Sequence, residues 1–231
     1  MEYSFLLLSG GIGSRMNVDK PKQYININGM PMIVYSLIAI KEIKEIKEIV
    51  VNYPKGEKKN LKRIINLSGI NKKITFVKAG QTRQESVYKM LKCAQYENTI
   101  IHEAARPIVN QSTFVNLINT NFINCGYMNE IPFTVAPVDS ISKTVTGTLD
   151  RNTLRNVLLP QKFNTKLLKN AHKVSKKNKK IFTEDACLFV ENGNQFHFIE
   201  GDLDNIKITY EIDIMLAENI LSIRENKQGK V

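Results

Sequence analysis

The sequence predicts an α/β protein with a mostly parallel central sheet that is covered by helices on both faces. Two observations support this fold class. Short apolar runs of strand character alternate with segments of helical period from residue 3 to residue 123. Polar stretches also follow three of the apolar runs, and loops at the carboxyl ends of parallel strands gather at one edge of the sheet.

The elements of this first part follow in regular order. Residues 3–8, 48–53 and 73–80 are predicted strands, and residues 98–107 are predicted to form a strand that runs into a polar loop ended by Pro107. Residues 31–43, 55–67, 83–94 and 111–123 are predicted helices, and Pro31 is tolerated in the first turn of the first one. Residues 55–67 read as a basic amphipathic helix, which is typical of a helix that covers a sheet.

The alternation breaks at residue 129. Residues 129–163 contain β-rich runs around a turn predicted at residues 146–148, which indicates a strand and then a projecting β-hairpin arm at about residues 138–162. A long exposed hairpin is marginally stable alone, so we expect the arm to pack on another subunit. Helices at 165–175, 184–191 and 211–225, a strand at 195–201 and a rim segment at 205–209 complete a single domain of residues 1–231.

Composition narrows the classes of partner and site. The net charge of +11 indicates an anionic partner, which can be nucleic acid, an acidic membrane surface or a phosphorylated molecule. The three cysteines form no C-x-x-C pair, so neither a disulfide framework nor a zinc site is indicated. The first apolar run is too short for a signal peptide and no run reaches the length of a membrane span, so we expect a cytoplasmic protein without membrane contact.

The stretch SGGIGSRM at residues 9–16 is the first candidate site. The spacing of a Walker phosphate loop is absent, and Met16 stands where a dinucleotide fingerprint needs its third glycine after Gly11 and Gly13. Backbone N–H groups of such a loop can still surround phosphate oxygens, with Arg15 and Lys22 supplying charge. The alternative is a tight turn with surface cations, and the loop alone does not distinguish the two.

A series of motifs then gives the chain a family resemblance. In order, these are GGIGSRM with KPKQY, GQTRQESV, HEAARP, APVDSISKT, DRNTL, LPQKF, TEDAC and NIKIT. The chain resembles the sugar-nucleotidyltransferase-like cytidylyltransferases, in the group that contains the 2-C-methyl-D-erythritol 4-phosphate and ribitol-5-phosphate enzymes. The resemblance implies a Rossmann-like fold of the nucleotidyltransferase type and an enzyme that transfers CMP from CTP to a small polyol phosphate. It also implies Mg²⁺ and the release of pyrophosphate.

The resemblance implies a role for individual residues of the nucleotide site. The glycine loop and its cations would hold the triphosphate, and the segment from Gly80 to Ser86 would form the cytosine and ribose pocket. The residues implied in catalysis are Arg15, Lys22 and Lys207. Those implied in CTP binding are Ser9, Gly10, Gly11, Gly13, Gly80, Arg83 and Ser86.

The acceptor site is implied by later motifs. The residues implied in acceptor binding are Glu103, Arg106, Ser140, Arg151 and Thr209. Glu103 stands where the family usually has Asp and would also bind Mg²⁺, a metal that prefers hard oxygen ligands. The arm would dimerise the chain and deliver Ser140 and Arg151 to the neighbouring site. The neighbouring His102 is expected to pack in the core, and the TED sequence at residues 183–185 is interpreted as a helix cap.

Two acceptors fit the motifs. GGIGSRM is closer to the ribitol-phosphate enzymes, so ribitol or glycerol phosphate for a teichoic or capsular polymer is the first expectation. The alternative is 2-C-methyl-D-erythritol 4-phosphate of isoprenoid biosynthesis, which TRQESV, AARP and DRNTL favour. A basic nucleic-acid-binding protein is a distant third interpretation, because the basic residues are spread along the chain and no reading motif occurs.

Overall fold

The computed structural model describes residues 1–13, 16 and 20–228. A seven-stranded sheet with the order β11-β7-β10-β6-β1-β4-β5 forms its centre. All neighbouring strands are parallel except at β10, which runs antiparallel to both β6 and β7. The predicted α/β class with a mostly parallel sheet is therefore confirmed.

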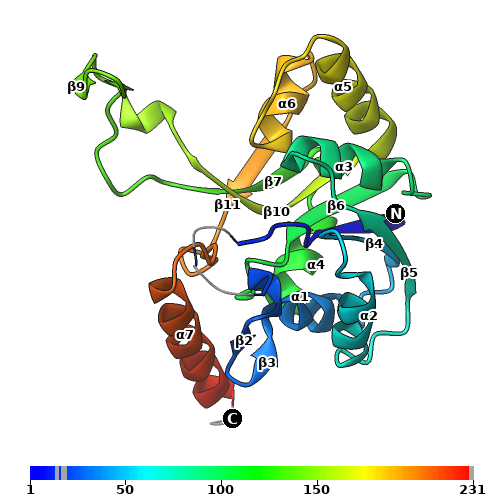
Figure 1. Ribbon diagram of the computed structural model, residues 1–231. Coiled ribbons are helices and arrows are strands. Elements are labelled where there is room, and N and C mark those ends of the chain that lie inside the picture. Colours follow the sequence, from blue (N-terminus) through cyan, green and yellow to red (C-terminus); the bar gives the residue numbers. More distant parts are fainter. Residues whose placement is uncertain (14–15, 17–19, 229–231) are drawn as a thin grey trace.

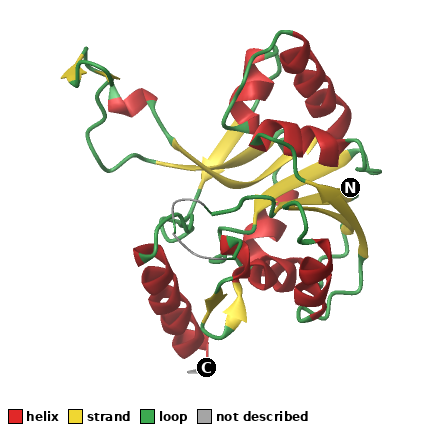
Figure 2. Ribbon diagram, viewed as in Figure 1, coloured by secondary structure: helices red, strands yellow, loops and turns green. Residues whose placement is uncertain are grey.

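The helices cover the two faces of the sheet, as Figure 2 shows. In β1, Tyr3, Phe5 and Leu7 join a core with α1, α2 and α4, whereas Leu6 and Leu8 join a second core with α3, α5 and α6. Alternate residues of a strand point to opposite faces. Because all six residues of β1 are buried, this strand lies at the centre of both layers.

Most element boundaries agree with the sequence predictions within a few residues. The main-sheet strands are β1 Tyr3–Leu8, β4 Ile46–Tyr53, β5 Lys73–Lys78, β6 Asn98–Glu103, β7 Cys125–Asn129, β10 Asn156–Asn164 and β11 His197–Glu200. The α-helices are α1 Met32–Ile40, α2 Lys58–Asn66, α3 Arg83–Leu91, α4 Gln111–Asn119, α5 Thr165–Lys177, α6 Asp185–Glu191 and α7 Ile212–Gln228. Short elements are η1 Lys22–Tyr24, β2 Asn26–Ile27, β3 Met30–Pro31 and η2 Arg151–Thr153.

The projecting arm exists, but two of its predicted features are wrong. Its hairpin pairs β8 Val138–Asp139 with β9 Thr144–Val145, so the turn lies at residues 140–143 and not at 146–148. The Asp139 carboxylate fixes this turn by accepting the N–H groups of Ile141 and Ser142, and Lys143 takes a φ of 57°. Residues 156–162 belong to β10 of the main sheet and not to the arm.

The carboxyl-terminal helix α7 packs beside the small β2–β3 hairpin, below the arm in the view of Figure 1. A third core of Met16, Ile27, Met32, Ala105, Ile108, Ile208 and Ala217 joins these elements to the rim of the sheet. Within the described part of the chain, no helix is both long enough and apolar enough to cross a membrane.

Candidate active site

The candidate site lies at the carboxyl ends of β1 and β6, where Leu8 is in register with Glu103. A cavity of about 190 Å³ opens there. Its lining residues are Leu8, Gly11, Lys22, Gln23, Arg83, Glu103, Ala105 and Lys207. The fold thus brings together Gly11, Lys22, Arg83, Glu103 and Lys207, which the sequence placed in the site from four separate motifs.

Glu103 is the electrostatic centre of the cavity. Its carboxylate lies 3.0 Å from Arg83 Nε and 2.6 Å from Lys207 Nζ, and its side chain is 9% exposed. Burial would raise the pKa of Glu103, but Arg83, Lys207 and Arg106 outweigh burial and lower it to about 2. Glu103 is therefore ionised at neutral pH and neutralises part of the positive charge around it.

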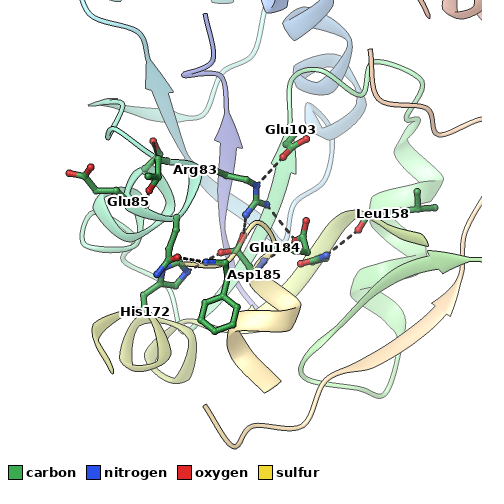
Figure 3. Close-up of polar contacts among 12 residues, drawn as sticks. Arg83, Glu85, Glu103, Leu158, His172, Glu184 and Asp185 are labelled. Carbon is green, nitrogen blue, oxygen red and sulfur yellow. Dashed lines mark hydrogen bonds and ion pairs between the residues drawn. The ribbon is translucent and has the colours of Figure 1, made fainter. Parts of the chain in front are cut away.

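Arg83, at the first position of α3, is held by carboxylates on both sides, as Figure 3 shows. Besides Glu103 it contacts Asp185, at 2.6 Å, and Glu184, at 3.5 Å. Burial opposes its charge, but Asp185, Glu184 and Glu103 raise the pKa of Arg83 above its ordinary value. The guanidinium is thus a fixed cation at the edge of the cavity.

Asp185 has a larger role than the sequence indicated. Glu184 does cap α6, because its carboxylate accepts the N–H of Asp185, as the TED motif predicted. Asp185 itself is 1% exposed, and its second oxygen lies 2.9 Å from His172 Nε2. Burial would raise the pKa of Asp185, but Arg83 and His172 together lower it. A chain of polar contacts therefore runs from His172 through Asp185 and Arg83 to Glu103, with a hydrogen bond at its first step and ion pairs at the next two.

The glycine loop is clamped from both sides by buried amides. Asn52 Oδ1 accepts the N–H of Ser9 at 2.6 Å, and Gln23 Nε2 donates to the Ser9 carbonyl at 2.6 Å. Both side chains are almost fully buried, at 1% for Asn52 and 2% for Gln23. These two residues fix the start of the loop, and neither of them was predicted from the sequence.

Glycine suits positions 10, 11 and 13 of the loop for different structural reasons. A Cβ on Gly10 would lie 2.5 Å from Asn52 Nδ2, so no side chain fits there. Gly13 has a φ of +74°, a conformation that favours glycine. A Cβ on Gly11 would meet nothing within 4 Å among the described atoms, so its backbone faces open space on the cavity side. Arg15, the predicted partner of this loop, lies outside the described residues.

The segment from Gly80 to Ser86 forms the start of α3 next to the site. The Ser86 hydroxyl accepts the N–H of Gly80 at 2.9 Å and donates to the Thr82 carbonyl at 2.9 Å. The Thr82 hydroxyl caps the helix by accepting the N–H of Glu85. In this structure Ser86 therefore shapes the backbone of the predicted nucleotide pocket through hydrogen bonds within its own segment.

The 205–209 segment crosses the rim and brings Lys207 to Glu103. Lys22 Nζ donates to the Ile208 carbonyl at 2.8 Å, and the Ile208 N–H donates to the Ala105 carbonyl at 2.8 Å. Arg106, predicted at the acceptor, donates to the Asn205 carbonyl at 2.7 Å and supports the same segment. Thr209 donates its backbone N–H to Asp213 at the start of α7.

Ser140 and Arg151 lie far from this cavity in their own chain. Both are exposed on the arm, which projects away from the body of the molecule (Figure 1). Arg151 donates to the Pro132 carbonyl at 3.3 Å, at the base of the arm. The structure does not bring these two acceptor candidates together with Glu103 within one chain.

Glu103 and His102 are adjacent in the sequence, but Glu103 lines the cavity and His102 lies in the core. His102 is fully buried between Phe5 and Phe114, and its Nε2 lies 3.2 Å from the Arg106 carbonyl. Burial and the nearby Arg106 charge lower the pKa of His102 to about 3, against a weaker effect of its hydrogen bond. The prediction that His102 packs in the core is confirmed, and the ring is neutral there.

No group of three or more metal-ligand side chains of the His, Cys, Asp and Glu types occurs in the described part of the chain. Among the described residues that line the cavity, Glu103 is the one carboxylate, and it lies among cations. Mg²⁺ is often held by one or two carboxylates together with substrate phosphates and water. The site thus fits a metal that arrives with a phosphorylated substrate.

Comparison with known proteins identifies the family. The family model described as IspD, 2-C-methyl-D-erythritol 4-phosphate cytidylyltransferase, matches residues 4–223. The chain is 32% identical over 228 residues to the enzyme of that name from Shouchella clausii, covering 98% of this chain and 100% of the relative. It is 32% identical over 225 residues to the one from Dictyoglomus thermophilum, covering 95% of this chain and 96% of the relative.

Solved structures agree with the sequence relatives. The 4-diphosphocytidyl-2C-methyl-D-erythritol synthase from Anaerococcus prevotii superimposes with a TM-score of 0.82 at 26% identity, covering 96% of both chains. The Thermus thermophilus enzyme of the family has the same fold, with a TM-score of 0.76 at 24% identity, covering 95% of this chain and 98% of that one. The chain belongs to the 2-C-methyl-D-erythritol 4-phosphate cytidylyltransferase family, whose members are CTP-dependent nucleotidyltransferases.

Proposed function

We propose that the chain transfers CMP from CTP to 2-C-methyl-D-erythritol 4-phosphate and releases pyrophosphate. The family match and the names of the relatives favour this acceptor over the ribitol or glycerol phosphate that the glycine motif suggested first. The observation that carries the proposal is the cavity in which Lys22, Arg83 and Lys207 surround Glu103 beside an open glycine loop.

The reaction needs charge and alignment more than proton transfer. An oxygen of the acceptor phosphate attacks the α-phosphorus of CTP, and the bond from that phosphorus to the bridging oxygen breaks. Pyrophosphate leaves with the electron pair. The attacking oxygen is already anionic, so no general base is required, but two anions must be brought into contact. Fixed cations stabilise the charge that gathers at the α-phosphoryl group and the leaving group.

Each cation has a proposed place in this reaction. Lys22 would contact the triphosphate, as would Arg15 by the family resemblance, and the open backbone at Gly11 lets the phosphate oxygens approach closely. Lys207 lies between the predicted nucleotide and acceptor sides, on the segment that Lys22 and Arg106 hold. Gly80, Arg83 and Ser86 line the side on which the cytosine and ribose are expected.

Glu103 is the proposed Mg²⁺ ligand. It lines the cavity, is ionised because of its low pKa, and supplies the hard oxygen donor that this metal prefers. When bound, the metal would neutralise charge on the triphosphate. Glu103 also orients Lys207 and Arg83, so its removal is expected to disturb both cations.

The arm is proposed to complete the site of a second copy of the chain. Exposed apolar side chains line it, including Phe133 at 77%, Val138 at 58% and Ile141 at 96% exposure. Such a surface is unfavourable in water and fits a protein partner. Arg151 and Ser140, distant from the cavity of their own chain, would contact the acceptor phosphate bound to the neighbour.

The test is pyrophosphate release with CTP, Mg²⁺ and a panel of acceptors: 2-C-methyl-D-erythritol 4-phosphate, ribitol 5-phosphate, the glycerol phosphates, and no acceptor. We expect pyrophosphate release with 2-C-methyl-D-erythritol 4-phosphate. The control variant Lys20→Gln, which changes an exposed lysine outside the cavity, should release pyrophosphate with the same acceptor. We expect Lys207→Gln to reduce kcat/KM at least a hundredfold, about 3 kcal/mol of transition-state stabilisation.

The same panel measures the activity with the alternative acceptors, ribitol 5-phosphate and the glycerol phosphates. The GGIGSRM motif favoured ribitol or glycerol phosphate, and Glu103 in place of the usual Asp leaves the identity of the acceptor open to test. Faster release with one of these acceptors than with methylerythritol phosphate would refute the proposed substrate. Release with none of them would refute the proposed reaction for all the polyol phosphates in the panel.

A further inference from the structure

A second cavity, of about 340 Å³, lies on the outer side of α3, away from the active site. It is bounded by α3, by the carboxyl-terminal part of α5, and by the loop that leads from α5 to α6. Its volume falls within the usual range for small-molecule sites. Its lining residues include Tyr88, His172, Lys176, Lys179, Lys180 and Ile181.

The lining of this cavity is strongly positive. Lys176, Lys179 and Lys180 all line the cavity. Lys180 forms an ion pair at 2.6 Å with Glu191, a residue that does not line the cavity. Glu85 is the only carboxylate among the described lining residues, and it is already paired with Lys89 at 3.0 Å. A cavity with this balance attracts an anion.

The cavity also has an apolar and planar wall. The Tyr88 ring lies under two ammonium groups, those of Lys92 at 4.6 Å and Lys176 at 5.9 Å from its centroid. Ile181, another lining residue, is 77% exposed and adds apolar surface to the cavity. An anion that carries an apolar or planar body would cover this wall while its charge meets the lysines.

His172 lines the cavity, and one of its two ring nitrogens has no hydrogen-bond partner among the described residues. The residue is 1% exposed, and its ring is parallel to that of Tyr88 at a centroid distance of 6.1 Å. Its Nε2 faces Asp185, whereas Nδ1 is buried and has no hydrogen-bond partner among the described residues. A buried imidazole nitrogen without a partner is costly, and a polar ligand atom would satisfy it.

His172 connects this cavity to the active site. The connection runs through contacts of 2.9 Å to Asp185, 2.6 Å from Asp185 to Arg83, and 3.0 Å from Arg83 to Glu103 (Figure 3). The first turn of α3 adds a second connection, because Arg83 faces the active site while its neighbours Thr82 and Gln84 line the second cavity.

We propose that the second cavity binds a phosphorylated organic molecule with an apolar or planar body, and that its occupancy changes the affinity of the active site for CTP through His172, Asp185 and Arg83. The binding half of this proposal is independent of the proposed function. The regulatory half rests on CTP binding in the first cavity, as the family implies.

The binding half is tested by calorimetric titration with three probes. Phenyl phosphate offers a planar body, 3-methylbutyl diphosphate offers an apolar chain, and inorganic phosphate offers neither. We expect one of the organic probes to bind one molecule per chain, at least fivefold more tightly than inorganic phosphate. The organic probe that binds more tightly shows whether the cavity prefers a planar body or an apolar chain. Equal affinity for all three probes would show that the cavity attracts only the phosphate charge, and it would overturn the proposal.

Variants locate the binding. Lys179→Gln and Tyr88→Leu should each weaken the tighter probe at least fivefold, provided that their melting temperatures match the parent. Lys173→Gln, an exposed lysine of α5 outside the lining, is the matched control and should leave the affinity unchanged. Weakening by Lys22→Gln with no effect of Lys179→Gln would place the probe in the active site and refute the second site.

The regulatory half is tested by titrating CTP with and without saturating probe. We expect the dissociation constant of CTP to change about fivefold, which is typical of coupled sites. In Asp185→Asn protein the probe should still bind while this change disappears. An unchanged CTP affinity in the parent protein would refute the regulation. Because no acceptor is present, a wrong acceptor assignment does not affect this result.

Discussion

The two adjacent glycines at positions 10 and 11 give the sharpest test of the site, because the same substitution should act on different properties at each. In Gly10→Ala, the new Cβ would lie 2.5 Å from Asn52 Nδ2 and 2.6 Å from Ala79 Cβ. In Gly11→Ala, the new Cβ would have no described atom within 4 Å. The first change therefore perturbs packing, and the second places a methyl group in the cavity.

The magnitudes follow from these distances. Overpacking costs about 1–3 kcal/mol, and disturbing the Asn52–Ser9 hydrogen bond adds about 1 kcal/mol. Gly10→Ala should therefore lose roughly 3 kcal/mol of unfolding free energy, which lowers Tm by about 6–12 °C in a domain of this size. Gly11→Ala should change stability by no more than about 0.5 kcal/mol. Its CTP affinity should fall at least about tenfold, or ~1.4 kcal/mol.

Urea denaturation and calorimetric titration with CTP measure the two properties separately. Gly11→Ala is the folding control for Gly10→Ala, and the parent protein is the control for both. If Gly11→Ala binds CTP as well as the parent, the triphosphate does not approach this backbone. If Gly10→Ala is as stable as the parent, the packing of the loop against Asn52 is wrong.

Three further predictions concern other parts of the molecule. The pKa of His102 is lowered from 6.5 to about 3, so the unfolded chain binds a proton first as pH falls. This residue should therefore remove about 2 kcal/mol of stability between pH 6.5 and pH 4.5, a loss that urea titrations of His102→Phe should lack; parallel curves would contradict this. Asp185→Asn leaves Arg83 facing a neutral partner and should cost about 3 kcal/mol of unfolding free energy, whereas a loss below about 0.5 kcal/mol would show that the ion pair is dispensable. Finally, mixing inactive Arg15→Ala and Arg151→Ala chains should restore part of the activity if the arm acts on its neighbour; mixed dimers without activity would exclude a shared site.

The sequence was sufficient for the order of elements but not for the topology of the sheet. The alternation of apolar runs and helices identified β1, β4, β5 and β6 within a few residues. It placed residues 156–162 in the arm, because β10 follows directly from the arm and is antiparallel to its neighbours. Its position between β6 and β7 depends on pairing across long sequence distances, which local pattern does not contain.

The same limit applies to the site. Motifs located Lys22, Glu103 and Lys207, because each stands in a short recognisable string. Asp185 was interpreted as part of a helix cap, since its partner Arg83 is 102 residues away. Asn52 lies next to the last residue of an ordinary apolar strand, and only its 2.6 Å contact with Ser9 reveals its function. Supporting residues of this kind have no local signature, because their role is defined by the partner.

The contacts that hold the cations of the cavity have a consequence for the thermodynamics of binding. Lys22 donates to a carbonyl, while Lys207 and Arg83 pair with Glu103, so their rotamers are restricted in the free protein. Immobilising a lysine or arginine side chain costs about 2 kcal/mol of conformational entropy. Most of that loss occurs when the chain folds, so the entropy of CTP binding should be less unfavourable than for a site built from mobile lysines.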